Sequence, residues 1–168
     1  MSGNITKENN IYYEIRKKLR LSREKASEIL ESIPPERIER IEKERFLPHP
    51  DEVLIMSEKY NEPSLCNHYC SQECPIGQKY VPEIKVRDLS QIVLEMLASL
   101  NSMKKSQERL IEITADGVID NTELEDFINI QKELERISIT VETLQLWTEK
   151  MIADGKIDMD KYNAIKEK

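Results

Sequence analysis

Apolar residues recur at three- and four-residue spacing along most of the chain, which is the spacing of one face of an α-helix. In the first third, cap and breaker residues divide this pattern into four short helices, over about residues 10–19, 23–31, 34–42 and 51–60. Ser22 is expected to cap the second helix, and the Pro34-Pro35 pair is expected to start the third. The residues predicted to face inward are Ala26, Ile29, Leu30, Ile38, Ile41, Val53, Leu54 and Met56.

After Pro82 the same periodicity continues over much longer segments. One helix is predicted from Asp88 or Ser90 to about Thr114, and a second from after Asp120 to about Ile152. Two long helices joined by a short turn favour an antiparallel hairpin. Each would span roughly 40 Å, too long to bury its whole apolar stripe on one partner, so we expect a homodimer. The apolar stripes comprise Leu89, Ile92, Val93, Leu97, Leu100, Met103, Leu110 and Ile111 in the first helix, and Leu124, Phe127, Ile128, Leu134, Ile137, Val141, Leu144, Trp147 and Met151 on the inner face of the second.

These patterns predict an all-α fold in which a small helix-turn-helix domain (residues 1–62) is joined by a cysteine-containing segment (63–86) to a long helical hairpin (87–168). Composition agrees, since the chain is 34% charged and 5% aromatic and has only four glycines. The polar N-terminus and the lack of an apolar run of roughly 20 residues predict no secretion and no membrane span, and hence a cytoplasmic protein. No phosphate-binding glycine loop or nucleophile elbow is present, so we do not expect an enzyme.

Charge is distributed unevenly along the chain, although the formal total is −7. Between Lys7 and Lys25, seven basic residues face three acidic ones. A basic start on an acidic body is typical of a nucleic-acid-binding module attached to another domain. The alternative is a solvated helix face of mixed charge.

The first third also carries sequence motifs of a known kind. These are LSREKA at the start of the second helix, IPPERIERIE in the third with Ile38, Ile41 and Glu42, and the later Pro48. Over about residues 11–61 the chain resembles the Xre/Cro-type helix-turn-helix family of transcriptional regulators. The resemblance implies that the third helix enters the DNA major groove and that the start of the second contacts phosphate. The implied DNA-binding residues are Arg23 at phosphate, Glu36, Arg37, Glu39 and Arg40 at base edges, and Lys43 on the same outer face.

Several positions depart from the family pattern. Ser27 replaces the usual small alanine, the turn is one residue longer and lacks its glycine, and Glu44 replaces the glycine after the third helix. Because phosphate attraction supplies much of DNA affinity, a reading helix whose charges cancel predicts weak or strongly salt-sensitive binding. The alternative function is a helical adaptor that binds another protein and no DNA. The charges that cancel are Glu36, Glu39, Glu42 and Glu44 against Arg37, Arg40, Lys43 and Arg45.

All three cysteines lie within SLCNHYCSQECPIG, together with His68. An odd number of closely spaced cysteines argues against a disulfide framework. In a regular helix Cys66, Cys70 and Cys74 would spread over about 12 Å, so one metal ion would require a tightly coiled segment. Three alternatives stay open: zinc held by the three thiolates with His68 or with His49, an iron–sulfur cluster, or metal-free thiols packed as small apolar groups.

Two segments near the ends of the second long helix repeat a motif, ADGVIDNTELEDF and ADGKIDMDKYNAI. Asp116 to Glu123 matches the second half of a calcium-binding EF-hand loop, but oxygen ligands upstream of the glycine are lacking. In the second copy Lys161 stands where the bidentate acid belongs, so calcium binding is not expected. We predict helix-to-helix turns with left-handed glycines, the first closed by a capping box between Asp120 and Glu123.

Overall fold

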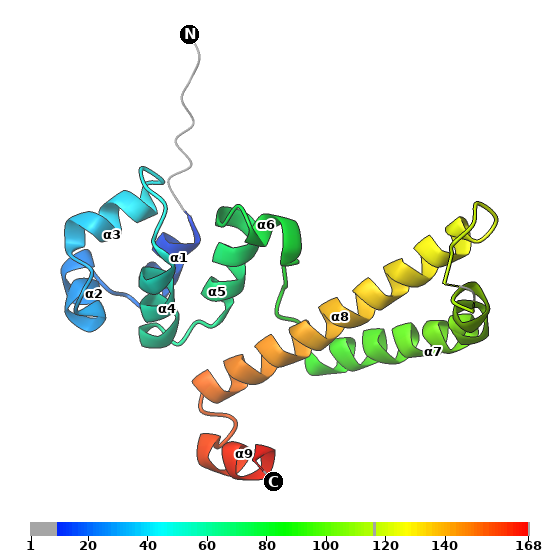
Figure 1. The fold of residues 1–168 in the computed structure, drawn as a ribbon. Coiled ribbons are helices and arrows are strands. Elements are labelled where there is room, and N and C mark those ends of the chain that lie inside the picture. The colour runs from blue at the N-terminus through cyan, green and yellow to red at the C-terminus, as the bar shows by residue number, and fades with distance from the viewer. Residues whose placement is uncertain (1–9, 116, 168) are drawn as a thin grey trace. The chain divides into compact units, whose positions relative to one another are not determined.

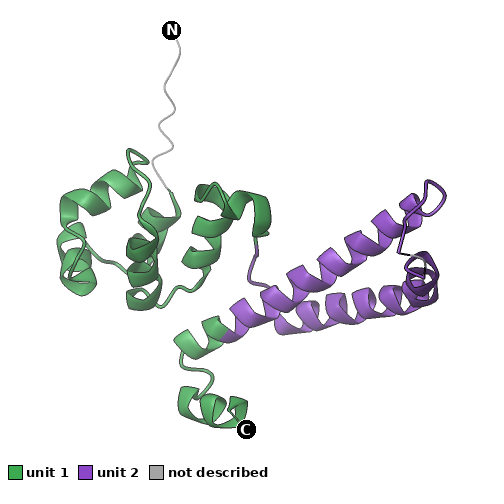
Figure 2. Cartoon of the chain, viewed as in Figure 1, with its two compact units in different colours: residues 1–83, 149–168 green, residues 84–148 purple. Residues whose placement is uncertain are grey.

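The computed structural model describes residues 10–115 and 117–167, and within them all regular secondary structure is helical (Figure 1). This confirms the predicted all-α fold. Asp116, the first residue of the calcium-like motif, lies outside the described residues. Two compact units are formed, one from residues 1–83 and 149–168 and the other from residues 84–148 (Figure 2). No helix of the described part is both long enough and apolar enough to cross a membrane.

The first unit begins with four short helices whose ends follow from local sequence. They are α1 (Ile11–Lys18), α2 (Arg23–Leu30), α3 (Pro35–Glu42) and α4 (Pro50–Lys59). The Asn10 side chain accepts a hydrogen bond from the Tyr13 amide at 3.1 Å. As predicted, the Ser22 hydroxyl caps α2 by accepting from the Lys25 amide at 3.2 Å. Proline occupies the first position of both α3 and α4, where the missing N–H has no helical partner.

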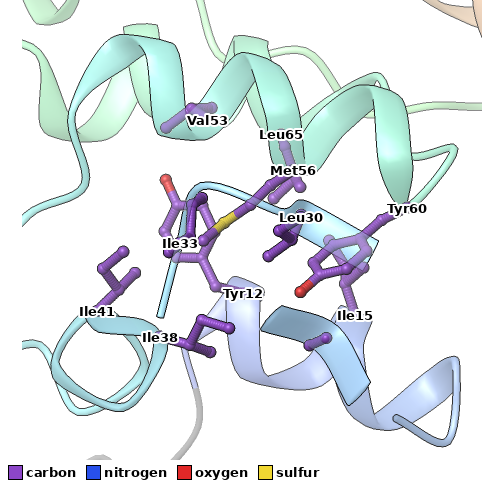
Figure 3. Close-up of a cluster of buried hydrophobic side chains, with 11 residues drawn as sticks. Tyr12, Ile15, Leu30, Ile33, Ile38, Ile41, Val53, Met56, Tyr60 and Leu65 are labelled. Carbon is purple, nitrogen blue, oxygen red and sulfur yellow. The ribbon is translucent and has the colours of Figure 1, made fainter. Parts of the chain in front are cut away.

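A cluster of apolar side chains from these helices forms the core of the first unit (Figure 3). The predicted burial of Ala26, Leu30, Ile38, Ile41, Val53 and Met56 is confirmed. The prediction was wrong for Ile29 and Leu54, which are 36% and 55% exposed. Each of these two residues is next to a buried residue in the sequence, so its side chain points about 100° away from that residue around the helix axis. Helices of eight and ten residues bury only a narrow face in the core, and both side chains lie outside it.

The cysteine-containing segment also packs into the first unit. It forms α5 (Ser64–His68), a π-helical turn η1 (Tyr69–Glu73) and α6 (Gly77–Tyr80). Leu65 is fully buried and belongs to the same core as Tyr12 and Met56. The segment is therefore an integral part of this unit.

The second unit contains most of the predicted hairpin. Its helices are α7 (Leu89–Ile113) and α8 (Leu124–Ala153), the latter extending beyond the unit. Between them Gly117 has a left-handed φ of 74°. The predicted capping box is confirmed: the Asp120 carboxylate accepts from the Glu123 amide at 3.1 Å, and the Glu123 carboxylate accepts from the Asp120 amide at 3.3 Å.

The second copy of the repeated motif is likewise a turn between helices. Gly155 has a φ of 69°, and the Asp158 side chain caps α9 (Met159–Lys166) through the Lys161 amide at 3.1 Å. Both copies therefore have the turn geometry predicted for them.

The hairpin covers only part of its apolar surface. Ile92, Ile113 and Ile130 are buried, whereas the predicted inward orientation of α8 is wrong for Leu124, Ile128, Leu134 and Val141. These four are 39–47% exposed because a single neighbouring helix cannot cover an apolar arc this wide. Further exposed apolar residues on α7 are Leu89, Val93, Leu97, Leu100 and Ile111.

Candidate nucleic-acid interface and cysteine segment

The helix-turn-helix consists of α2, the residues 31–34 and α3. Ile33, in the turn, is buried beside Leu30, which fixes the path of the chain between the helices. Glu31, directly after α2, and Glu44, shortly after α3, have left-handed φ values of 58° and 52°. A left-handed conformation costs a residue other than glycine roughly 1–2 kcal/mol, so these two turns store backbone strain.

Arg23, the predicted phosphate contact, is held by a carboxylate of the same unit. Its Nε lies 2.9 Å from Oε2 of Glu42, and about a third of its side chain is exposed. Glu42 is buried and also binds Arg16, whose Nη2 donates to Oε2 at 2.8 Å. The carboxylate of Glu42 thus joins α1, α2 and α3. Arg23 is therefore already paired with a carboxylate of the protein, which reduces its availability to a DNA phosphate.

Arg37, a predicted base contact, also forms hydrogen bonds within the first unit. Its guanidinium donates to both oxygens of Glu52, at 2.7 and 2.6 Å, and to the carbonyl of Leu47 at 3.0 Å. Burial acts to raise the pKa of Glu52, but the hydrogen bonds from Arg37 and from the His49 amide outweigh it and lower that pKa. Arg37 therefore ties α3 to α4 and to the loop between them.

The other predicted residues remain on the solvent side of α3. Glu36 and Arg40 are exposed, and Arg40 lies over the ring of Phe46 with 5.8 Å between the guanidinium carbon and the ring centroid. Lys43 pairs with Glu39 one turn away, with 47% of the Lys43 side chain and 35% of the Glu39 side chain exposed. An exposed pair of this kind is worth under about 1 kcal/mol, so Lys43 can exchange this partner for another anion.

The structure therefore divides the six predicted DNA-binding residues into two groups. Glu36, Glu39, Arg40 and Lys43 share the outer side of α3, whereas Arg23 and Arg37 are held by carboxylates. Arg45, not among the predicted site residues, is exposed just after α3 and adds a cation to this side. Phe46 and Leu47, also missed, are 58% and 60% exposed. The sequence signal that could have found Phe46 and Leu47 is the occurrence of two large apolar residues in the loop between Arg45 and Pro48.

The cysteine segment departs from a regular α-helix at η1, where one turn is wider than an α-helical turn. In η1 the Cys74 amide donates to the Tyr69 carbonyl at 2.9 Å, five residues back, and π-helical turns of this kind are frequent at functional sites. Gly77 lies so close to Cys70 that a Cβ at that position would overlap the carbonyl of Cys70. Only glycine fits there, and this close approach lets α6 pack on η1.

One carboxylate connects the cysteine segment to α1. The Tyr12 hydroxyl donates to Oε2 of Glu73 at 3.0 Å, and Nε2 of His68 lies 3.6 Å from Oε1 of the same residue. The rings of Tyr12 and His68 meet edge to face, 6.3 Å apart. Burial, followed by the charge of Glu73, raises the pKa of Tyr12, so its hydroxyl stays protonated and donating.

Cys66, Cys70 and Cys74 are free cysteines, and each is partly buried. Burial raises the pKa of Cys70, and the neighbouring Cys74 and Cys66 raise it further. Within the described residues, no group of three or more His, Cys, Asp or Glu side chains has an arrangement that could hold a metal ion. His49, the other proposed ligand, precedes α4 and is exposed. Zinc or iron–sulfur ligation by Cys66, His68, Cys70 and Cys74 stays a prediction.

Comparison of the chain with protein-family models, with curated proteins and with solved structures found no match.

Proposed function

We propose that the protein is a sequence-specific DNA-binding transcriptional regulator of the cytoplasm, similar to the Xre/Cro type, whose α3 enters the major groove. The observation that carries this proposal is the outer side of α3, where Arg40, Lys43 and Arg45 are exposed beside a complete helix-turn-helix. Cations at the end of a reading helix and in the loop after it are placed to meet phosphate, and side chains earlier on its outer side are placed to meet bases.

The residues of this surface are assigned different roles. Arg40 and Glu36 face base edges, where arginine pairs with guanine and a carboxylate accepts from cytosine. Lys43 and Arg45 neutralise phosphates. Arg23 and Arg37 act as positioning residues, since their guanidinium groups fix α2, α3 and the loop through Glu42 and Glu52.

The exposed acids of α3 limit the affinity that this surface can supply. Glu36 and Glu39 lie among the three cations on the outer side of the helix. Repulsion between these carboxylates and phosphates offsets part of the attraction, which weakens binding, so low salt is the condition under which binding is best detected.

The first test measures binding of the full chain to genomic DNA fragments by an electrophoretic mobility-shift assay at low salt. Arg40→Ala/Lys43→Ala/Arg45→Ala should abolish the shift, because it removes the three exposed cations and leaves Arg23 and Arg37 in place. The control Lys18→Ala/Lys59→Ala/Lys79→Ala removes the same charge elsewhere and should retain it. A wild-type chain that shifts no fragment at low salt contradicts the proposal.

A second candidate is the adaptor, favoured by the exposed apolar residues beside α3. Phe46, Leu47 and Leu54 are each more than half exposed, and Phe46 and Leu47 directly follow Arg45 of the proposed DNA surface in the chain. Exposed apolar groups with mixed charge around them are typical of protein-binding surfaces. A photo-crosslinker at Phe46 distinguishes the two functions: crosslinks to DNA support the regulator, and crosslinks to one cellular protein without DNA binding support the adaptor.

A further inference from the structure

The α7–α8 hairpin contains a cleft that is lined by polar side chains from both helices. Ser102 and Ser106, one turn apart on α7, form one wall. The cleft has a volume of about 490 Å³, which is within the range of small-molecule sites in proteins. Its described lining lies wholly within the second unit. The lining residues contributed by α8 are Asn129, Lys132, Glu133, Glu135 and Arg136.

Burial separates a floor from a rim in this cleft. Ser102, Ser106 and Glu133 are half-buried, whereas the other lining residues are exposed. Serine is the smallest side chain that bears a hydroxyl group, so two serines one turn apart leave room between the helices. A small molecule in this room contacts Glu133 at the floor and the charged side chains of the rim at its mouth.

The carboxylate of Glu133 is only partly satisfied by the chain. Its Oε1 accepts a hydrogen bond from Nη1 of Arg136 at 3.1 Å. Its Oε2 is shielded from solvent and accepts no hydrogen bond from any described residue. A shielded carboxylate oxygen without a donor costs free energy, so a donor that enters the cleft is bound favourably. Because this acceptor is charged, an ammonium group is the donor that suits it best.

The serine hydroxyls of the cleft are also available to a ligand. Thr140 and Thr143 on α8 donate to carbonyls of their own helix, at 2.8 and 2.6 Å. Ser102 and Ser106 form no hydrogen bond of this kind, nor any side-chain hydrogen bond to another described residue. Each hydroxyl can both donate and accept, so the α7 wall suits a polar group of a ligand.

Unpaired charges of both signs lie at the rim. Lys132 and Glu135 form no ion pair with a described residue, unlike Arg109 and Asp126 of the same two helices, which pair with 2.7 Å between Nε and Oδ2. A molecule that carries an ammonium group and a carboxylate close together complements Glu133 and Lys132 at once. We propose that the cleft binds a free amino acid, with its ammonium group on Oε2 of Glu133 and its carboxylate at Lys132.

The lining also indicates the class of amino acid. None of the described residues that line the cleft is apolar. A hydrocarbon side chain gains little there, whereas a hydroxyl or amide group can hydrogen-bond to the two serines and to the amide of Asn129. Serine, asparagine and glutamine are therefore the expected ligands. This site goes beyond the proposed DNA binding and does not depend on it.

The experiment is isothermal titration calorimetry of the full chain, without DNA, with L-serine, L-asparagine and L-glutamine in turn. At least one of them should bind with a dissociation constant below about 1 mM. Glu133→Gln should weaken that binding about 10- to 100-fold, because an amide of the same shape lacks the charge that attracts the ammonium group. Glu142→Gln is the matched control: Glu142 lies nine residues further along α8, on the opposite side of the helix. That control should leave the dissociation constant unchanged within about twofold.

A change in the ligand provides a test that does not depend on a variant folding. The analogue of the bound amino acid in which hydrogen replaces the ammonium group is 3-hydroxypropanoate, succinamate or glutaramate, respectively. It should bind the wild type about 10- to 100-fold more weakly than the amino acid does. Glu133→Gln, with its helices verified by circular dichroism, should bind the two ligands equally within about twofold.

Three results overturn the inference. The first is no binding of any of the three amino acids at concentrations up to about 10 mM. The second is equal binding of the amino acid and its analogue by the wild type. The third is a folded Glu133→Gln variant that binds the amino acid as tightly as the wild type does.

Discussion

The guanidinium of Arg16 and the carboxylate of Glu42 form a two-point ion pair between α1 and α3, with both side chains at least 95% buried. Arg16 also donates to the carbonyl of Leu21 at 2.6 Å, in the loop before α2. The hydrogen bonds that Arg16 donates to Glu42 are the main cause of the raised pKa of Arg16, which stays charged. Since Glu42 binds Arg23 as well, one buried carboxylate sets the positions of three helices.

Glu42→Gln is expected to destabilise the first unit by about 3–5 kcal/mol, because it leaves the Arg16 charge buried without a counter-charge. The measurement is the free energy of unfolding from urea denaturation followed by circular dichroism. Glu39→Gln is the control, since Glu39 forms only a surface pair with Lys43, and its effect should stay within about 0.5 kcal/mol. Equal effects of the two substitutions would show that the buried pair does not organise the unit.

Glu52 makes stability depend on acidic pH. Its pKa in the folded protein is lowered below that of the unfolded chain, so its contribution is complete above the unfolded value of about 4.3 and is lost as pH falls through the folded value. Glu52→Gln should therefore cost about 1–3 kcal/mol at pH 7, and the difference from the wild type should shrink on acidification below about pH 4. A difference that stays constant over this range contradicts the assigned role of the Arg37–Glu52 pair.

Gly77→Ala should loosen the packing of α6 on η1, because the added Cβ overlaps the Cys70 carbonyl. The expected cost is about 1–3 kcal/mol, together with faster reaction of the cysteine thiols with Ellman's reagent. Gly155→Ala is the control, since a Cβ at Gly155 meets no atom within 4 Å and the strain comes only from its left-handed backbone. That control should leave the thiol reaction rate unchanged. Equal thiol rates in both variants would refute the close packing.

The metal prediction is checked by elemental analysis and the visible spectrum of protein purified without oxygen. A zinc site predicts about one zinc ion per chain and no visible colour, whereas an iron–sulfur cluster predicts iron, sulfide and visible absorption. Cys70→Ser should release either one, because Cys70 lies between the other two cysteines in the sequence. Native protein with no bound metal would leave the three thiols with a packing role alone.

Local signals in the sequence were sufficient for α1 to α4 and for the two long helices, whereas α5, η1 and α6 were not predicted. Ser22, the Pro34-Pro35 pair and the Asp120–Glu123 capping box act through neighbours within four residues, so their roles follow from spacing. The burial of Ile38 and Ile41 follows from helical periodicity in the same way. Leu54 and Ile29 were mispredicted because periodicity gives the direction of a stripe but not its width, which depends on the packed partners.

The candidate site was harder to predict because it depends on long-range pairs. Arg23 and Arg37 look like free cations in the sequence, and only the fold shows Glu42 and Glu52 beside them, 19 and 15 residues away. Arg40 has no such carboxylate partner among the described residues and keeps its predicted exposure. Tight coiling of the cysteine segment was expected only as the condition for binding one metal ion, and the π-helical turn η1 was not predicted. The contact of η1 with Tyr12 through Glu73 was not predicted either, because Tyr12 and Glu73 are 61 positions apart.

The central claim, that the outer side of α3 binds DNA through Arg40, Lys43 and Arg45, is tested most directly by the salt dependence of affinity for a labelled DNA duplex. Each phosphate contact contributes about 0.9 to the slope of log affinity against log salt concentration. Arg40→Ala/Lys43→Ala/Arg45→Ala should reduce the slope by about 2, because Lys43 and Arg45 are the two phosphate contacts among these residues, while Lys18→Ala/Lys59→Ala/Lys79→Ala should leave it unchanged. Identical slopes for the wild type and the α3 variant would contradict the claim.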